Sequence, residues 1–364
     1  MKKIYTQPRT ESVATTPQKI LCASGGIKAQ ISGYKQNTGG GFTQTFAWLA
    51  GIVCSSLLFL GTACSTTNNP DQPKPQAELK PRTLIVTQQA VRRLPQATIT
   101  ENGDVLDALW SKNDKVFYRN LSREAYYDKE TDSNPDLSGT LNADKDGSVA
   151  SFSGDRVWCT EDDQLALIYP VPNPSAFTFH DNPLTAEYTI SIAGQDGTLA
   201  TLAKDFHHIY GIASVVSVTG TTANAELAQM KSLMTVCKFS FVDESDNQLP
   251  ITLLPISTLS ISVSDGYYVG TYPQQGTVSI AQSTPAWDVS VDPERKASGN
   301  GGEPLTITPE GNPKEVYVAL FPDMETTYKF TVTSGGNTYT GEATATLKEG
   351  EYVPATGLKL TKKP

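Results

Sequence analysis

The sequence has few of the side chains that most often perform catalysis or bind metals. In 364 residues it contains three His, at positions 180, 207 and 208, and five Cys. No nucleophile elbow, phosphate-binding loop or dinucleotide-binding fingerprint occurs in it. Carboxylates such as Glu161, Asp162 and Asp163 are plentiful, and solvation of a protein surface explains them without a catalytic pair. The sequence therefore predicts a protein that is not an enzyme and needs no cofactor.

Two segments imitate metal sites without completing them. Adjacent side chains on a strand point to opposite faces, so His207 and His208 are expected at a strand end near Tyr210 and not on a zinc ion. Residues 142–148 place oxygen ligands at alternate positions, as a calcium loop does. Position twelve of that loop would be Ser153, where a bidentate Glu is needed. We expect a polar hairpin turn there and no metal.

Positive charge is scarce over most of the chain. The formal net charge is −9, yet residues 1–63 carry six basic side chains against Glu11 alone. Those residues sum to +5, which leaves −14 for residues 64–364. So acidic a body repels nucleic-acid phosphates and has no basic stripe to overcome the repulsion. The composition excludes nucleic acid as a partner.

The one long apolar run lies at residues 46–63, FAWLAGIVCSSLLFLGTA. A basic stretch precedes it and small residues lead to Cys64, which is the pattern of a secretory signal. It resembles the lipobox of bacterial lipoproteins, whose Cys is acylated and becomes the new N-terminus, although Gly61 stands where the box usually has Leu. An uncleaved anchor and a buried core strand are alternatives, and the run is short for ~20 spanning residues.

The segment at 64–82 is then a lipidated tether, because it has four prolines and no apolar run. Residues 1–63 are the targeting region, with an unusually long part before the apolar run. No second Met precedes Met230, so either the leader is long or the assigned start is wrong. We expect a lipoprotein exported to the extracellular face of the cell outer membrane.

Long helical patterns are nearly absent from the body of the chain. The best candidate is 223–234, with Leu227, Met230 and Met234 on one helical face, and it could also be a short connector. Strand patterns recur instead, with clear alternation at Leu259 and its neighbours. Turn signals such as Gly-Gly-Asn at 335–337 separate them and predict hairpins. The strand runs are TLIV from Thr83, KVFY from Lys115, SVASF from Ser148, QLALIYP from Gln164, AEYTISIA from Ala186, TVCKFSFV from Thr235, TLSISVS from Thr258, EVYVALFP from Glu315 and YKFTVTS from Tyr328. Many short strands at regular spacing predict an all-β chain of sandwich domains.

Two cysteines remain in the body once the leader is removed and Cys64 carries lipid. Cys159 and Cys237 could form a bridge in an oxidising compartment. Cys237 alternates with Phe239 and Phe241 on an apolar face, where a small buried thiol is natural. We therefore favour two unpaired thiols.

The order of the motifs resembles the fimbrillin family, the fimbrial subunits of Bacteroidales and their relatives. After the lipobox and tether come an Arg and a short strand, ATIT at 97–100. They are followed by WSKNDKVFY from Trp110, SVASFSGD from Ser148 and ALIYP ending at Pro170. The second half continues through VYVALFP from Val316 and closes with YKFTVTSGGNTYTGEATATLKEGEYV. The resemblance covers most of residues 83–364.

That resemblance implies two tandem transthyretin-like β-sandwich domains, at 83–222 and 223–364. It also implies that a protease cuts after an Arg near the start of the mature chain, for which Arg92 and Arg93 are the candidates. The outermost first strand is then lost and a strand of another fimbrial subunit replaces it, because the open groove has unpaired backbone groups and exposed apolar side chains. A solvated basic pair at a strand end is the alternative for the two arginines.

The expected function is a structural or accessory subunit of fimbriae, with a role in adhesion. Its partners would be other fimbrial subunits, the outer membrane through the lipid, and a host protein or glycan receptor. The alternative is a glycan-binding lipoprotein that does not polymerise. Its candidate sugar-stacking aromatics are Tyr126, Tyr127, Tyr267, Tyr268, Tyr272 and Trp287, any of which could instead pack in a core.

Overall fold

The computed structural model describes residues 18–19, 80–88, 98–102, 105–124, 137–173, 177–181, 184–246, 251–264, 266–283 and 286–364. Contacts divide the chain into two units, one of 1–23 with 77–364 and one of 24–76, and the second lies outside the described residues. The predicted signal run, Cys64 and both Arg92 and Arg93 therefore also lie outside them. Across the described ranges, no helix combines the length and hydropathy needed to cross a bilayer.

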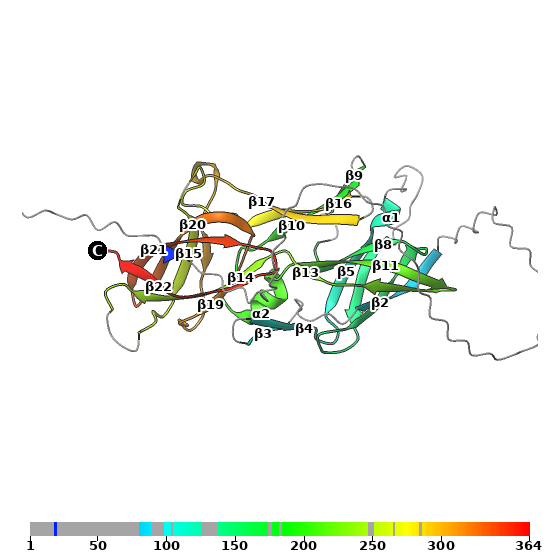
Figure 1. Cartoon of the computed structure of the whole chain (residues 1–364), viewed down its shortest axis with the longest axis horizontal. Coiled ribbons are helices and arrows are strands. Elements are labelled where there is room, and N and C mark those ends of the chain that lie inside the picture. The colour runs from blue at the N-terminus through cyan, green and yellow to red at the C-terminus, as the bar shows by residue number, and fades with distance from the viewer. Residues whose placement is uncertain are drawn as a thin grey trace, which may run out of the picture. The chain divides into compact units, whose positions relative to one another are not determined.

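The first group of strands closes into a ring. The ring closes because β12 (Thr222–Leu227) pairs with both β2 (Lys80–Gln88) and β11 (Ile209–Thr219). Figure 1 shows β2 in the same group as β5, β8 and β11. In ring order the strands are β2 (Lys80–Gln88), β7 (Ser151–Cys159), β6 (Ser138–Ala143), β5 (Lys115–Asn120), β8 (Gln164–Tyr169), β11 (Ile209–Thr219) and β12 (Thr222–Leu227), with β13 (Lys231–Ser232) paired to β11. A closed ring leaves no free edge between these strands.

The candidate helix at 223–234 does not form. Strand β12 runs from Thr222 to Leu227 and pairs in parallel with β2, and β13 follows it at Lys231–Ser232. Leu227, Met230 and Met234 are each fully buried. They come from the end of one strand and from the two turns beyond it, so their spacing of three and four residues imitates a helical face.

The second group of strands forms a long sheet and a smaller one. Strand β14 (Thr235–Asp243) pairs in parallel with β22 (Tyr352–Lys362) and antiparallel with β19 (Val316–Leu320), and β1 (Gln18–Lys19) pairs in parallel with β21 (Asn337–Leu347). The long sheet has the order β18 (Leu305–Ile307), β15 (Thr258–Val263), β20 (Asp323–Ser334), β21 (Asn337–Leu347), β22 (Tyr352–Lys362), β14 (Thr235–Asp243) and β19 (Val316–Leu320). The smaller one has the order β17 (Ala286–Pro293), β16 (Gln275–Ser283), β10 (Leu184–Ser191) and β9 (Thr178–Asp181). The hairpin predicted at 335–337 is confirmed, with Gly335 and Gly336 at φ of 54° and 79° between β20 and β21.

The remaining elements are short. A hairpin of β3 (Thr98–Asn102) and β4 (Val105–Leu109) pairs with no other strand among the described residues. The helices are α1 (Leu121–Glu124), α2 (Leu199–Thr201), the π-helix η2 (Leu202–Phe206) and the 3₁₀-helix η3 (Ser298–Asn300). The prediction of an all-β chain is confirmed. The tandem of transthyretin-like domains and its division at residue 222 stay predictions.

Two apolar cores hold these strands together. One lies inside the ring and includes Leu84, Val86, Trp110 and Phe152. The other joins the second group of strands to residues such as Phe117 on the opposite side of the ring strands. Residues 116–118 are all buried because β5 has a core on each face. Both Cys159 and Cys237 are buried and form no disulfide with each other, as the apolar pattern favoured.

Candidate functional site

The first strand of the ring is the part of the fold on which the sequence argument depends. Strand β2 is parallel to β12, with Thr83 opposite Thr222, and antiparallel to β7, with Lys80 opposite Cys159. It is therefore paired along both edges, and the expectation of an outermost strand is wrong. The physical reason is β12, which returns from β11 and covers the edge that the sequence left open.

The inward face of β2 fills a slot between its two neighbours. Leu84 and Val86 are fully buried in the ring core, and Arg82 and Gln88 at either end are 5% and 2% exposed. The outward side chain of Thr87 is exposed. Loss of this strand would uncover unpaired backbone groups on both walls and a hole in the core between them.

One end of the slot is closed by Trp110. Its indole Nε1 donates a hydrogen bond of 3.1 Å to Oε1 of Gln88. The ring packs edge-on against Phe152 and Tyr169, at centroid distances of 5.0 and 5.7 Å. The Trp110 backbone bridges to Gly147 beyond β6. The sequence motif that begins at Trp110 thus supplies a fixed hydrogen-bond donor to the end of β2.

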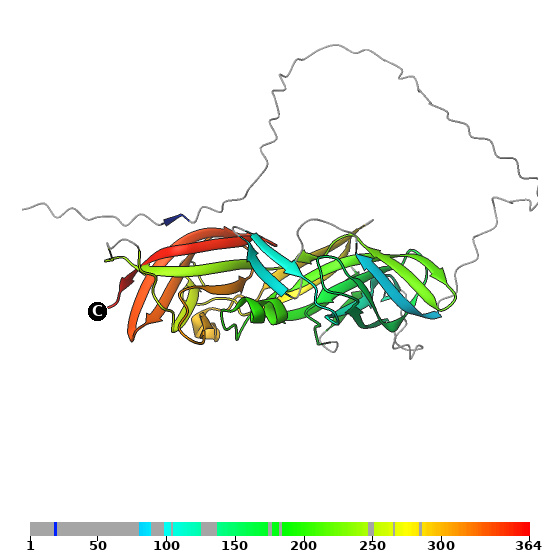
Figure 2. The ribbon, with the colours of Figure 1, turned by 90° about the horizontal axis from the view of Figure 1, so that it is seen from below.

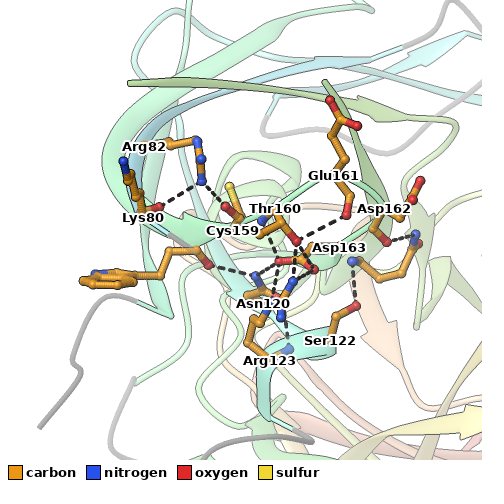
Figure 3. Close-up of polar contacts among 12 residues, drawn as sticks. Lys80, Arg82, Asn120, Ser122, Arg123, Cys159, Thr160, Glu161, Asp162 and Asp163 are labelled. Atoms are coloured by element: carbon orange, nitrogen blue, oxygen red, sulfur yellow. Dashed lines mark hydrogen bonds and ion pairs between the residues drawn. The ribbon is translucent and has the colours of Figure 1, made fainter. Parts of the chain in front are cut away.

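The other end of the slot carries a buried polar cluster (Figure 3). Nη1 of Arg82 donates to the carbonyl oxygens of Cys159 and of Lys80. Beyond Cys159, the buried carboxylate of Asp163 accepts hydrogen bonds from the Asn120 side chain at 2.9 Å and the Arg123 Nη2 at 2.8 Å. These contacts tie α1 to the turn between β7 and β8.

The Asp163 cluster offers no nucleophile to a substrate. Burial, together with the negative charge of Asp163, raises the pKa of the Cys159 thiol to about 11. A thiol with so high a pKa stays protonated at neutral pH and is a poor nucleophile. The cluster positions strands and does not resemble a reactive centre.

A second polar cluster, which sequence reasoning missed, holds the hairpin that follows Arg93. Glu101 in β3 accepts hydrogen bonds of 2.6 Å from the hydroxyls of both Tyr317 and Tyr352 and of 3.0 Å from Lys238 Nζ. Figure 2 shows this hairpin, in cyan, against the red β22. Burial works against the charge of Glu101, but these hydrogen bonds and the charge of Lys238 outweigh it and lower its pKa. Nothing in the sequence around Glu101 signals these partners.

The segments that imitate metal sites serve backbone contacts. Asp144 accepts from the Ser151 N–H at 2.8 Å and Asp146 from the Lys112 N–H at 2.7 Å, so both carboxylates brace the turn before β7. His207 and His208 are buried directly before β11. Within the described ranges, no three His, Cys, Asp or Glu side chains lie close enough to hold a metal ion.

The candidate sugar-stacking aromatics do not form one surface. Tyr272 is 3% exposed, and Trp287 is packed against the second core. Tyr267 is 75% exposed and lies edge-on to Tyr268 at 5.3 Å. Tyr126 and Tyr127 lie outside the described residues. Among the candidates that the structure describes, Tyr267 is the one that is largely exposed.

Comparison with known proteins finds similarity in structure alone. No family model matches the chain, and no curated protein matches its sequence. A Bacteroides uniformis protein described as a cell adhesion protein is 13% identical, with a TM-score of 0.46, over 80% of this chain and 98% of its own. A Bacteroides ovatus fimbrial protein is 11% identical, with a TM-score of 0.34, over 77% of this chain and 49% of its own.

A further similar structure is the shaft pilin SpaA of Lactobacillus rhamnosus. It is 9% identical, with a TM-score of 0.28, over 78% of this chain and 99% of its own. All three TM-scores lie below 0.5, so the strands and cores described above carry the argument for the fold. The structures found are thus those of a cell adhesion, a fimbrial and a pilin protein, two of them from Bacteroides.

Proposed function

We propose that the chain is a structural or accessory subunit of a surface fimbria. It is exported as a lipoprotein acylated at Cys64, and it assembles when β2 is exchanged for a strand of another subunit. The observation that carries the proposal is the place of β2, which lies at the start of the folded body and fills a slot between β7 and β12. Only one backbone cut after Gln88 is needed to free it.

The free energy of the slot favours replacement of β2 by another strand over a slot that stays empty. Burying Leu84 and Val86 contributes about 1.5–3 kcal/mol for each side chain. The backbone groups of β7 and β12 that now bond to β2 would also lose their partners. Unpaired backbone groups in a core cost free energy. A processed subunit would therefore bind an extended segment from a neighbour, which satisfies both walls at once.

The arginine pair lies at the right place in the chain for such a cut. Arg92 and Arg93 stand between the end of β2 at Gln88 and the start of β3 at Thr98. A cut there leaves the hairpin of β3 and β4 attached, because Glu101 is held by Tyr317, Tyr352 and Lys238. Processing would thus remove β2 and leave the rest of the chain anchored.

The test is to compare residues 65–364 with residues 94–364 by gel filtration and negative-stain microscopy. The longer form should be monomeric, and the shorter form should form oligomers or fibres that an added first-strand peptide prevents. Treatment of the longer form with an Arg-specific protease should reproduce the assembly, and Arg92→Ala with Arg93→Ala should block it. If both forms stay monomeric with and without the peptide, assembly by this route is overturned.

The lipid anchor has a separate test in the native host. Mass spectrometry of the N-terminus should find acylated Cys64 on the unprocessed protein and a free end at Arg93 or Leu94 on the processed one. The variant Cys64→Ala should leave the protein unacylated and absent from the outer-membrane fraction. Normal membrane recovery of that variant would remove the lipoprotein assignment and leave the strand-exchange test standing.

A further inference from the structure

The inward face of β2 is polar at its two ends and apolar between them. Arg82, Leu84, Val86 and Gln88 alternate along the strand and are all at most 5% exposed. An ordinary core strand would present apolar side chains at all four positions, because burial of a polar group is costly unless it is hydrogen-bonded. Each polar end therefore has to match a specific group on the wall of the slot.

The wall at the Gln88 end presents a donor. Trp110 is 1% exposed, and its Nε1 donates to Gln88 Oε1 at 3.1 Å. An indole N–H is a donor only, so an occupant without an acceptor at this position would leave it buried and unpaired. The position of the donor is fixed, because Phe152 and Tyr169 pack against the ring.

The wall at the Arg82 end presents an acceptor. The carbonyl oxygen of Cys159 accepts from Nη1 of Arg82. A long side chain that carries N–H donors suits this end, and an acidic side chain, which can only accept, does not.

We infer that the slot selects its occupant by direction and register as well as by apolarity. Its occupant is an extended segment of another subunit that runs in the direction of β2. That segment carries a cationic donor for the Cys159 carbonyl, two branched apolar residues at the second and fourth positions beyond it, and an acceptor for Trp110 at the sixth. This rule rests on the proposed strand exchange and specifies its partner.

The rule excludes two other ways of filling the slot. A segment that runs in the opposite direction would bring its cation, which has donors and no acceptor, to the Trp110 N–H, so that this buried donor is left unpaired. A shift of two residues would keep the same face inward but would place a polar side chain where Leu84 or Val86 now packs. Both arrangements bury unpaired polar groups.

The test uses the mature chain, 65–364, cut with an Arg-specific protease and kept with its released strand. A labelled peptide of residues 78–90 in excess should exchange into the slot, as followed by fluorescence anisotropy. A peptide with Gln88→Leu should bind roughly tenfold more weakly, because it leaves the Trp110 N–H unpaired. A peptide with Thr87→Val, which changes an exposed position, should bind like the original.

Two further arms establish direction and the Trp110 contact. A peptide with Arg82→Leu should also bind roughly tenfold more weakly, and the reversed sequence should not compete. On a cut Trp110→Phe chain, the original peptide and its Gln88→Leu form should bind within about twofold of each other, because no donor remains to be paired.

The outcomes distinguish failure of the selection rule from failure of the proposed strand exchange. If the Gln88→Leu, Arg82→Leu and reversed peptides all exchange as well as the original, the slot selects by apolarity alone. The rule is then wrong and strand exchange stands. If the original peptide also fails to enter the cut chain, strand exchange and the rule fail together. The peptide series on the unsubstituted chain decides between these results even if Trp110→Phe does not fold.

Discussion

The side-chain amide of Gln195 pairs with the backbone of Ala319 as a neighbouring strand residue would. Its Nε2 donates to the Ala319 carbonyl at 2.9 Å, and its Oε1 accepts from the Ala319 N–H at 2.7 Å. Gln195 is 4% exposed, and Gly197 accepts from the Tyr317 N–H beside it. Together these contacts cover the free edge of β19, which would otherwise offer a strand edge to other chains.

Substitution of Gln195 should therefore destabilise the chain and uncover that edge. The variant Gln195→Leu leaves the Ala319 backbone groups buried without partners, so we expect a loss of about 2–3 kcal/mol in the free energy of unfolding. Urea denaturation measures this loss, with Gln282→Leu as a control at an exposed position of β16 that should change by less than about 0.5 kcal/mol. Equal stability of the two variants would show that the Gln195 contacts contribute nothing.

The alternation of apolar and polar residues predicted most of the strands well. It did not predict which strands pair with one another to close the ring. The runs at Leu259 and Gly335 gave β15 and the hairpin of β20 and β21, because period-two patterns and positive-φ glycines are encoded by neighbouring residues. The sequence of strand β12, TANAEL, alternates as well, but its buried face has only the small residues Ala223 and Ala225 before Leu227. So weak an apolar pattern did not distinguish a strand from the candidate helix, and the closure of the ring was not predicted.

Removal of the Glu101 carboxylate should loosen the hairpin of β3 and β4. The variant Glu101→Gln weakens the hydrogen bonds to Tyr317 and Tyr352, and we expect a loss of about 1 kcal/mol at pH 7 because the site is partly solvated. The effect should also appear as faster amide exchange in residues 98–109. The exposed residue Glu325 provides the control, and Glu325→Gln should leave both quantities unchanged.

The same contact has a predictable pH dependence. The folded pKa of Glu101 lies below its ordinary value of 4.5, so its contribution is fully present above that value and is lost as the pH falls through the folded pKa. The stability difference between the unsubstituted chain and Glu101→Gln should therefore narrow below about pH 4. A difference that stays constant to pH 3 would mean that the charge of Glu101 does not contribute.

Because of His208, the folded chain should become less stable in mildly acidic solution. Burial lowers its pKa from 6.5 to about 4, against a weak opposing hydrogen bond to the Ser191 carbonyl at 3.4 Å. The unfolded chain then takes up the proton first, so stability falls as the pH drops from about 6.5 towards 4, by up to roughly 3 kcal/mol.

The variant His208→Gln isolates that contribution. Thermal unfolding at pH 7 and pH 4.5 should show a smaller loss on acidification for His208→Gln than for the unsubstituted chain. Other titrating groups act on both chains and cancel in the comparison. Equal losses in the two chains would show that His208 is not the group responsible.

The Trp110 contact and the Glu101 cluster differ in how far the sequence could have predicted them. The Trp110 contact follows from a motif that was recognised, and only its partner, Gln88, was unknown until β2 was placed. Glu101 lies 137 residues from Lys238 and 251 from Tyr352. Contacts at such separations depend on how the two groups of strands pack, which the alternation within each strand does not encode.

Cys159 should report the state of the slot in solution. Its thiol lies inside the ring opposite Lys80 of β2, fully buried and with its pKa raised to about 11, so it should resist maleimide labelling in the intact mature chain at pH 7. After cleavage at Arg92 or Arg93 and displacement of β2, labelling should accelerate by at least about tenfold, because the thiol becomes accessible. Cys237 lies in the other core and should stay protected, and the variant Cys237→Ala assigns the label without ambiguity. Simultaneous labelling of both cysteines would mean that loss of β2 unfolds the whole chain, and such a chain would have no preformed slot to offer an incoming strand.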